Sequence, residues 1–408
     1  MAGSRHIAAV IAVGAALACG ACTTTSQGTL TPVAEAAEGS TNIQILAVTN
    51  RKRSTTDAGE MFTGERSDET SYASVTVAAP PGSAPSGGGF QLPGLTGTTP
   101  RNFVTVGADH LDKRAFSAAI SNHAKQTGRN KVLIFVHGFN NRFDDAVYRF
   151  AQVVHDSGAE GIPVLFTWPS RGELRLNAYA YDRESAIYSR DTLEQLLDTL
   201  AANRDVKEVN ILAHSMGNWV TLEALRSKAI GGGRAGIGNK VKNVFLVAPD
   251  VDVDVFRTQI RRMGNARPRF ALFVSQDDKA LSVAQFIWGG MPRIGDINPE
   301  QEPYRDVLAQ EQITVFDLTK LPGNNAHTRA FDDITQVIVM VREQLDSEPV
   351  VTQGGRVAGG RGNEPVVTQG GRVSGKRAPE PVVTQGGRVD GKRANDKGKA
   401  RAALTTAE

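Results

Sequence analysis

The segment from Val209 to Val220 (VNILAHSMGNWV) constrains the fold most, because it joins a short apolar strand, an abrupt turn and the beginning of a helix. The turn carries Ser215 at the centre of A-H-S-M-G. In the nucleophile elbow G-x-S-x-G, a sharp strand-to-helix turn leaves room only for small residues beside the serine. Ala213 and Gly217 meet that requirement. The segment therefore predicts a nucleophilic serine, and a serine that only caps a helix is the alternative.

Apolar segments typical of buried strands alternate with segments that have helical spacing over most of the chain. We predict strands over 42–50, 71–79, 103–106, 132–136, 163–167, 209–212, 243–247, 270–274 and 313–318. We predict helices over 113–126, 143–156, 178–202, from the serine turn to about 228, and 331–345, with a glycine-rich loop over 231–238. Such alternation predicts an α/β fold with a mostly parallel central sheet and helices on both faces.

A serine nucleophile needs a base to take its proton and a carboxylate to orient that base. On this kind of sheet the chain order is serine, acid, histidine. Of the seven histidines, only His327 lies after Ser215, in the loop that follows the last predicted strand. His327 is therefore the expected base, and a surface residue near a helix N-terminus is the alternative.

The acid has three candidates, all of which follow predicted strands. Asp278 lies in the turn after strand 270–274 and is our choice, because a carboxylate there can reach a histidine on the next loop. Asp277 is its neighbour in the same turn. Asp250 ends the segment after strand 243–247 and is the third candidate.

The oxyanion of an acyl-transfer intermediate needs two backbone N–H donors, one directly after the nucleophile and one from an earlier loop. Met216 supplies the first. Phe139 is the expected second donor, because His-Gly directly after the buried strand 132–136 lets the backbone approach the substrate closely. The side chains that could line the adjacent pocket are those of His137, Asn140 and Trp168, for which packing, turn and capping roles are the alternatives.

The first 22 residues have a charged start and an apolar run that is short for a membrane span. They resemble an export signal, so we expect a periplasmic protein. The segment Gly20-Ala21-Cys22 resembles a bacterial lipobox, which makes Cys22 the expected lipidation site and a lipid anchor the expected membrane contact. Ordinary signal cleavage at Ala16-Leu17-Ala18 and an uncleaved N-terminal anchor are the alternatives. Cys19 is the only other cysteine, so no disulfide is expected in the folded body. Residues 23–41 have a linker composition.

Residues 347–408 form a low-complexity tail in which E-P-V-V-T-Q-G-G-R-V recurs from Glu348, Glu364 and Glu380, a period of 16 residues. From Glu348 onward 11 Lys and Arg face 6 Asp and Glu, so the tail carries +5 and the remaining body −2 (35 against 37). We expect no nucleic-acid partner for the body. The tail is typical of a flexible basic segment, and an acidic envelope polymer is the partner that its charge suits.

The motifs together resemble the α/β-hydrolase superfamily, specifically a bacterial esterase/lipase-like group of unknown function. The resemblance covers roughly residues 42–345 and not the repeats, and we expect the hydrolase domain over 42–346. It is carried by these segments: AVTNRKR at 47–53, HGFNN at 137–141, FTWPS at 166–170, YDRES at 181–185, AHSMG at 213–217, APDVD at 248–252 and DKAL at 278–281. It implies the fold and the serine mechanism and names no substrate. Taken with the N-terminal segment and the predicted triad, it leads us to expect an exported serine hydrolase that cleaves a small-molecule or lipid-like carboxylic ester and needs no metal or organic cofactor. A thioesterase or amidase with the same triad, and an envelope-tethered binding protein that keeps the fold, remain alternatives.

Overall fold

The computed structural model describes residues 28–57, 59–82, 102–264, 267–276, 278, 281 and 290–319, except the side chains of 233–236, and the backbone of four two-residue strands further on. Several predicted features lie outside these residues: His327, Asp277, Cys22, the export signal and the helix over 331–345.

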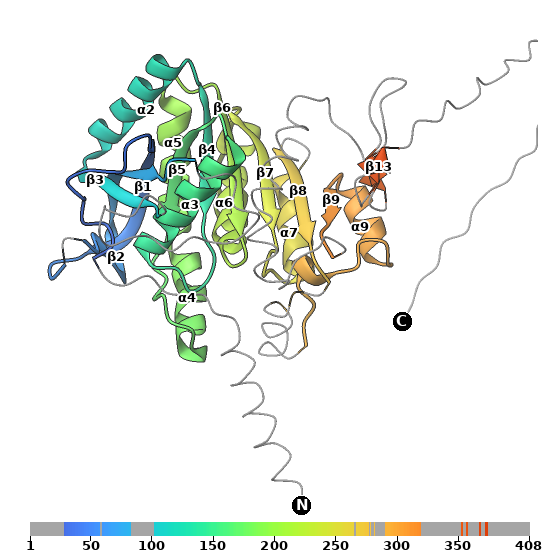
Figure 1. Cartoon of the computed structure of the whole chain (residues 1–408). Helices are drawn as coiled ribbons and strands as arrows, with labels where there is room; N and C mark the ends of the chain where they lie inside the picture. The colour runs from blue at the N-terminus through green and yellow to red at the C-terminus, as the bar shows by residue number, and fades with distance from the viewer. Residues whose placement is uncertain are drawn as a thin grey trace, which may run out of the picture.

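The fold is organised around one nine-stranded sheet, whose strands run in the order β3-β2-β1-β5-β4-β6-β7-β8-β9 across Figure 1. The strands are β1 (Thr41–Arg53), β2 (Phe62–Ala79), β3 (Val104–Leu111), β4 (Lys131–Val136), β5 (Ile162–Thr167), β6 (Glu208–His214), β7 (Val241–Val247), β8 (Arg269–Val274) and β9 (Thr314–Asp317). Only the pairs β1–β2 and β2–β3 are antiparallel, and the strands from β1 through β5 to β9 pair in parallel. The mostly parallel sheet that the sequence predicts is therefore confirmed.

Helices cover both faces of this sheet (Figure 1). They are α2 (Lys113–Thr127), α3 (Phe143–Ser157), α4 (Leu176–Tyr188), α5 (Arg190–Ala202), α6 (Gly217–Ile237), α7 (Val253–Met263), the short 3-10 helix η1 (Ile294–Asp296) and α9 (Tyr304–Gln310). Successive residues of a strand point to opposite faces. Ile134 accordingly packs in the core with α2, α5, α6 and α7, whereas the neighbouring Phe135 packs in a second core with α3.

The helix predicted over 178–202 is two helices, α4 and α5, which meet at Ser189. The Ser189 hydroxyl lies 2.7 Å from the carbonyl oxygen of Ser185 and 3.0 Å from Asn50 Oδ1, and its single proton is donated between these two acceptors. Bonds of this kind compete with regular helical bonding and redirect the backbone. The apolar periodicity on both sides of the break concealed it from the sequence pattern.

The prediction of a loop over 231–238 is wrong, because α6 continues to Ile237. Glycine disfavours a helix by only about 1 kcal/mol relative to alanine. Ile237 is 3% exposed and packs in the core with the other residues of that face. Burial of this side chain opposes the helix-breaking preference of the preceding glycines.

Two parts of the chain outside the sheet are also described. In the segment predicted as a linker, Leu30 is fully buried and the Thr29 hydroxyl donates to Asp144 Oδ2 at 2.7 Å, so this part packs against α3. In the first two repeats, Thr352–Gln353 pairs with Arg356–Val357 and Val367–Thr368 with Arg372–Val373, both antiparallel. Among the described residues no helix is long and apolar enough to cross a membrane.

Candidate active site at the carboxyl edge of the sheet

Ser215 lies in a strained turn between β6 and α6. Its φ angle is +50°, a left-handed conformation that non-glycine residues seldom adopt. Its amide donates to the carbonyl of Val247 at 2.9 Å, and its own carbonyl accepts from Asn218 N at 3.1 Å. Such strain costs on the order of 1–3 kcal/mol and persists only where the surroundings impose it. The serine side chain therefore stands at the carboxyl edge of the sheet, directly before the N-terminus of a helix.

The loop after β4 contacts this turn at two glycines. The strands β4 and β6 are neighbours, with Val136 opposite Ala213, so their following loops meet. A Cβ atom on Gly217 would lie 2.4 Å from the carbonyl oxygen of His137, and one on Gly138 would lie 2.9 Å from Ser215 Cβ. These distances are below van der Waals contact. The small residues that the elbow pattern requires are thus required here by backbone approach.

The two amides expected to bind an oxyanion are those of Phe139 and Met216. Within the part of the chain that the structure describes, neither amide donates a hydrogen bond. Unpaired backbone amides are uncommon in buried positions, and Met216 is buried. Two backbone amides that bond to no described residue are available to donate to a ligand oxygen.

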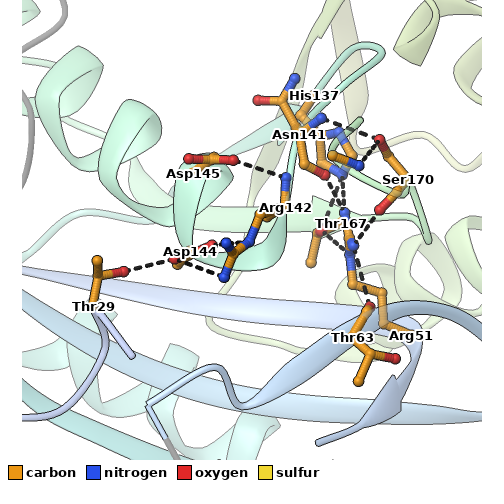
Figure 2. A network of polar contacts seen from close by, with 11 residues as sticks. Thr29, Arg51, Thr63, His137, Asn141, Arg142, Asp144, Asp145, Thr167 and Ser170 are labelled. Carbon is orange, nitrogen blue, oxygen red and sulfur yellow. Dashed lines mark hydrogen bonds and ion pairs between the residues drawn. The ribbon is translucent and has the colours of Figure 1, made fainter. Parts of the chain in front are cut away.

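A buried guanidinium, that of Arg51 at the end of β1, ties the surrounding loops together (Figure 2). It donates through Nε to Thr167 Oγ1 at 2.9 Å, through Nη2 to the carbonyl of Asn141 at 2.7 Å, and through Nη1 to the carbonyl of Ser170 at 2.8 Å. Nη1 also lies 3.3 Å from the carbonyl of Thr63, and Nη2 lies 3.4 Å from His137 Nε2. This cation therefore connects β1 and β2 with the loops after β4 and β5.

Asp182 on α4 supports the same loops from the other side. Its carboxylate accepts from the Ser170 hydroxyl at 2.5 Å, from Arg171 N at 2.9 Å and from Asn140 N at 3.3 Å. Asn140 has a positive φ of 56°, and asparagine tolerates this conformation better than most residues. Asp182 thus fixes the backbone of the residue that follows Phe139 in this turn.

Burial changes the protonation of this cluster. It lowers the pKa of Arg51 to about 10, although Asp182 partly opposes the shift. Burial, with Arg51 nearby, holds the pKa of His137 well below its ordinary value, so the imidazole is neutral. Burial raises the pKa of Asp182 to about 6 against three hydrogen bonds that favour its charged form.

The two described acid candidates both lie at this edge but have different surroundings. Asp278 is fully buried, its Oδ1 accepts from Leu281 N at 3.2 Å and its amide donates to the carbonyl of Ser275. Asp250 is 3% exposed, forms an ion pair of 3.3 Å with Arg293 and accepts a hydrogen bond from the Tyr179 hydroxyl. The side chain of Asp250 is therefore paired with a buried cation. Its backbone lies close to the serine turn, because its amide donates to the carbonyl of Ser215 at 3.4 Å.

The side chains considered as pocket lining are buried. Trp168 stacks on His137 with ring centroids 4.9 Å apart and donates through Nε1 to the carbonyl of that residue at 2.9 Å. Both residues are fully buried and Asn140 nearly so. Their contacts favour a packing role beneath the loop. Among the described residues no group of three His, Cys, Asp or Glu side chains could hold a metal ion.

The sequence pattern missed the roles of Arg51, Thr167 and Asp182. Arg51 and Asp182 each stand in a segment quoted for the family resemblance, and Thr167 stands in another. For Arg51 and Thr167 the available signal was a polar residue at or near the carboxyl end of a strand, whereas Asp182 lies on α4 and carried no such signal. Such a signal indicates a position at the carboxyl edge of the sheet, but it does not indicate which residue the side chain contacts there.

The chain was compared with known proteins. The family model described as "Alpha/beta hydrolase of unknown function (DUF900)" matches residues 112–343, more than half of the chain. No curated protein matches.

Solved structures with similar folds include the lin2722 gene product of Listeria innocua, at 8% identity and a TM-score of 0.34, which covers 55% of this chain and 97% of its own. A predicted CIB-like hydrolase of Thermoplasma acidophilum has 12% identity and a TM-score of 0.32, covering 53% of this chain and 86% of its own. A lipase-esterase related protein of Clostridium acetobutylicum has 10% identity and a TM-score of 0.30, covering 53% and 95%.

Proposed function

The chain belongs to the family of α/β hydrolases of unknown function, and from this premise we propose that it is a serine hydrolase that cleaves a carboxylic ester. The observation that carries the proposal is the strained Ser215, held at φ +50° between β6 and α6. A serine held in such a strained strand-to-helix turn is typical of a nucleophile, whereas an ordinary helix cap needs no positive φ.

In the proposed reaction, the Ser215 hydroxyl attacks the ester carbonyl while His327 takes its proton, and Asp278 orients the imidazole. The amides of Phe139 and Met216 stabilise the oxyanion of the tetrahedral intermediate. His327 then protonates the leaving alcohol, and water hydrolyses the acyl-enzyme by the same steps in reverse. This assignment of the oxyanion donors is supported by the absence of a partner for either amide among the described residues.

A fluorophosphonate probe, which reacts with activated serines, tests the nucleophile. We expect the wild type to be labelled and Ser215→Ala not to be labelled. Ser157→Ala is the matched control, because Ser157 is also buried but lies at the end of α3, where its hydroxyl donates to the carbonyl of Val153 at 2.6 Å and accepts from Ala159 N at 3.3 Å. Equal labelling of the wild type and Ser215→Ala would refute the nucleophile.

A screen over p-nitrophenyl esters of increasing acyl length, the matching thioesters and anilides tests the bond that is cleaved. Faster turnover of esters supports the proposal. Faster turnover of thioesters or anilides would replace it with a thioesterase or amidase. Folded protein that is neither labelled nor active on any of them would favour the envelope-tethered binding protein.

We propose in addition that the protein is exported and lipidated at Cys22. The support is the sequence alone, namely the apolar segment and the Gly-Ala-Cys ending. Mass spectrometry of protein recovered from a bacterial membrane fraction should detect a lipid on the wild type and none on Cys22→Ser. A lipid mass retained in Cys22→Ser would contradict lipidation at this position.

A further inference from the structure

The peptide between Gly138 and Phe139 is held from its carbonyl side. The carbonyl oxygen of Gly138 accepts a hydrogen bond from His137 Nδ1 at 2.8 Å and another from Asn141 Nδ2 at 3.3 Å. In a trans peptide unit the C=O and the N–H of the next residue are coplanar and point in opposite directions. Whatever fixes the Gly138 carbonyl therefore also fixes the direction of the Phe139 N–H.

The proton positions on His137 follow from its partners. A carbonyl oxygen can only accept, so Nδ1 must carry the proton that binds Gly138. Arg51 Nη2, which can only donate, lies 3.4 Å from Nε2, and burial lowers the pKa of the ring, so Nε2 carries no proton and is an acceptor. Its nearest partner is Thr167 Oγ1 at 3.0 Å.

The Thr167 hydroxyl receives its own orientation from Arg51. Arg51 Nε donates to Thr167 Oγ1 at 2.9 Å, and guanidinium can only donate. The single hydroxyl proton is then free to point at His137 Nε2. The chain of donors runs from Arg51 to Thr167, to His137 and to the Gly138 carbonyl. Figure 2 shows the first three of these residues.

We propose that Arg51 and Thr167 are positioning residues of the oxyanion hole: they select the Nδ1-protonated tautomer of His137, which anchors the Gly138 carbonyl and aims the Phe139 N–H at the substrate oxyanion. The inference rests on the proposed hydrolase function. The stacking of His137 on Trp168 prevents the ring from turning away. Arg51 Nη2, at 3.4 Å from Nε2, adds a second donor on the same side and opposes protonation there.

The Thr167→Val variant tests the relay because it keeps the shape of the side chain and removes the hydroxyl. Thr167→Ser, which restores the hydroxyl, should recover the wild-type behaviour. Thr105→Val is the control for a lost buried hydroxyl, since Thr105 is equally buried and its Oγ1 contacts Tyr148 at 2.7 Å and the carbonyl of Thr29 at 3.3 Å, away from the site.

The first readout is 15N NMR of the full chain labelled at histidine. We expect the wild-type His137 to carry its proton on Nδ1 only, and Thr167→Val to show protonation of Nε2 in part of the population. A wild-type His137 protonated on Nε2 would overturn the proposal. This readout does not depend on turnover, so it separates failure of the relay from failure of the proposed hydrolase function.

The second readout is hydrolysis of p-nitrophenyl butyrate. Removing one oxyanion donor typically lowers kcat by about 100-fold to 1,000-fold, and a misdirected donor should cost part of that. We expect kcat of Thr167→Val to fall about tenfold or more with KM nearly unchanged, and Thr105→Val to keep both. Unchanged kcat in Thr167→Val, an equal loss in Thr105→Val, or no recovery in Thr167→Ser would overturn the assignment.

Discussion

Gly217→Ala should damage the site although alanine is the better helix former. Gly217 begins α6, and its added Cβ would lie 2.4 Å from the carbonyl oxygen of His137 and 2.7 Å from that of Val136. Close carbon-to-oxygen contacts settle at about 3.3 Å. The helix start and the loop after β4 must therefore separate by about 0.9 Å, and both contacts are backbone atoms that no rotamer change can move.

The consequence for reactivity should exceed the consequence for stability. Overpacking of a core position costs about 1–3 kcal/mol, of which up to about 1 kcal/mol is returned by the helix propensity of alanine. A displacement of about 1 Å between reacting groups can lower a rate about 100-fold. We expect the rate of fluorophosphonate labelling to fall by about that factor, with a loss in unfolding free energy of no more than about 3 kcal/mol.

Gly231→Ala in the same helix is the matched control. A Cβ at Gly231 meets no atom within 4 Å, so this variant should gain about 0.5–1 kcal/mol and keep the wild-type labelling rate. The rate of fluorophosphonate labelling measures the reactivity of each variant, and denaturant unfolding measures its stability. A Gly217→Ala protein that is labelled within twofold of wild type would show that the backbone approach is not needed for reactivity.

Three further predictions concern the carboxylates. Asp278→Asn should lower the rate of fluorophosphonate labelling at least about tenfold more than Asp250→Asn does, if Asp278 orients the base; the reverse order would move the acid to Asp250. Asp250→Asn should instead lower the unfolding free energy by about 3 kcal/mol, since it leaves the buried Arg293 without its ion-pair partner; unchanged denaturant unfolding would contradict this. Burial raises the pKa of Asp182 to about 6, so the folded state binds this proton more tightly than the unfolded chain does. The stabilisation of the folded state by the protonated Asp182 is therefore complete below about pH 4 and is lost as the pH rises through about 6. Unfolding free energy measured across this range should fall by about 3 kcal/mol through this group, and an identical pH dependence in Asp182→Asn would refute the shift.

Much of the fold was predictable because its signals are local. Each strand from β4 to β8 begins and ends within two residues of the predicted range, since continuous apolar runs identify strands that are buried on both faces. The serine turn was predictable for the same reason: a strand, a tight turn and a helix follow one another within twelve residues. The break at Ser189 and the continuation of α6 through its glycines were not predictable, because hydrogen bonding and burial elsewhere in the fold override local preference there.

The sequence by itself determined which residues stand at the carboxyl edge of the sheet, because strand order along the chain and the period of the pleat fix that edge. Only the tertiary structure decided which of them touch. Arg51 lies 86 positions from His137, 90 from Asn141 and 116 from Thr167, and no local pattern encodes contacts at such separations. They depend on β1 lying beside β5, and β5 beside β4. A buried cation must satisfy its donors with whatever that arrangement brings within reach, and here it brings the backbone of the loop that carries Phe139.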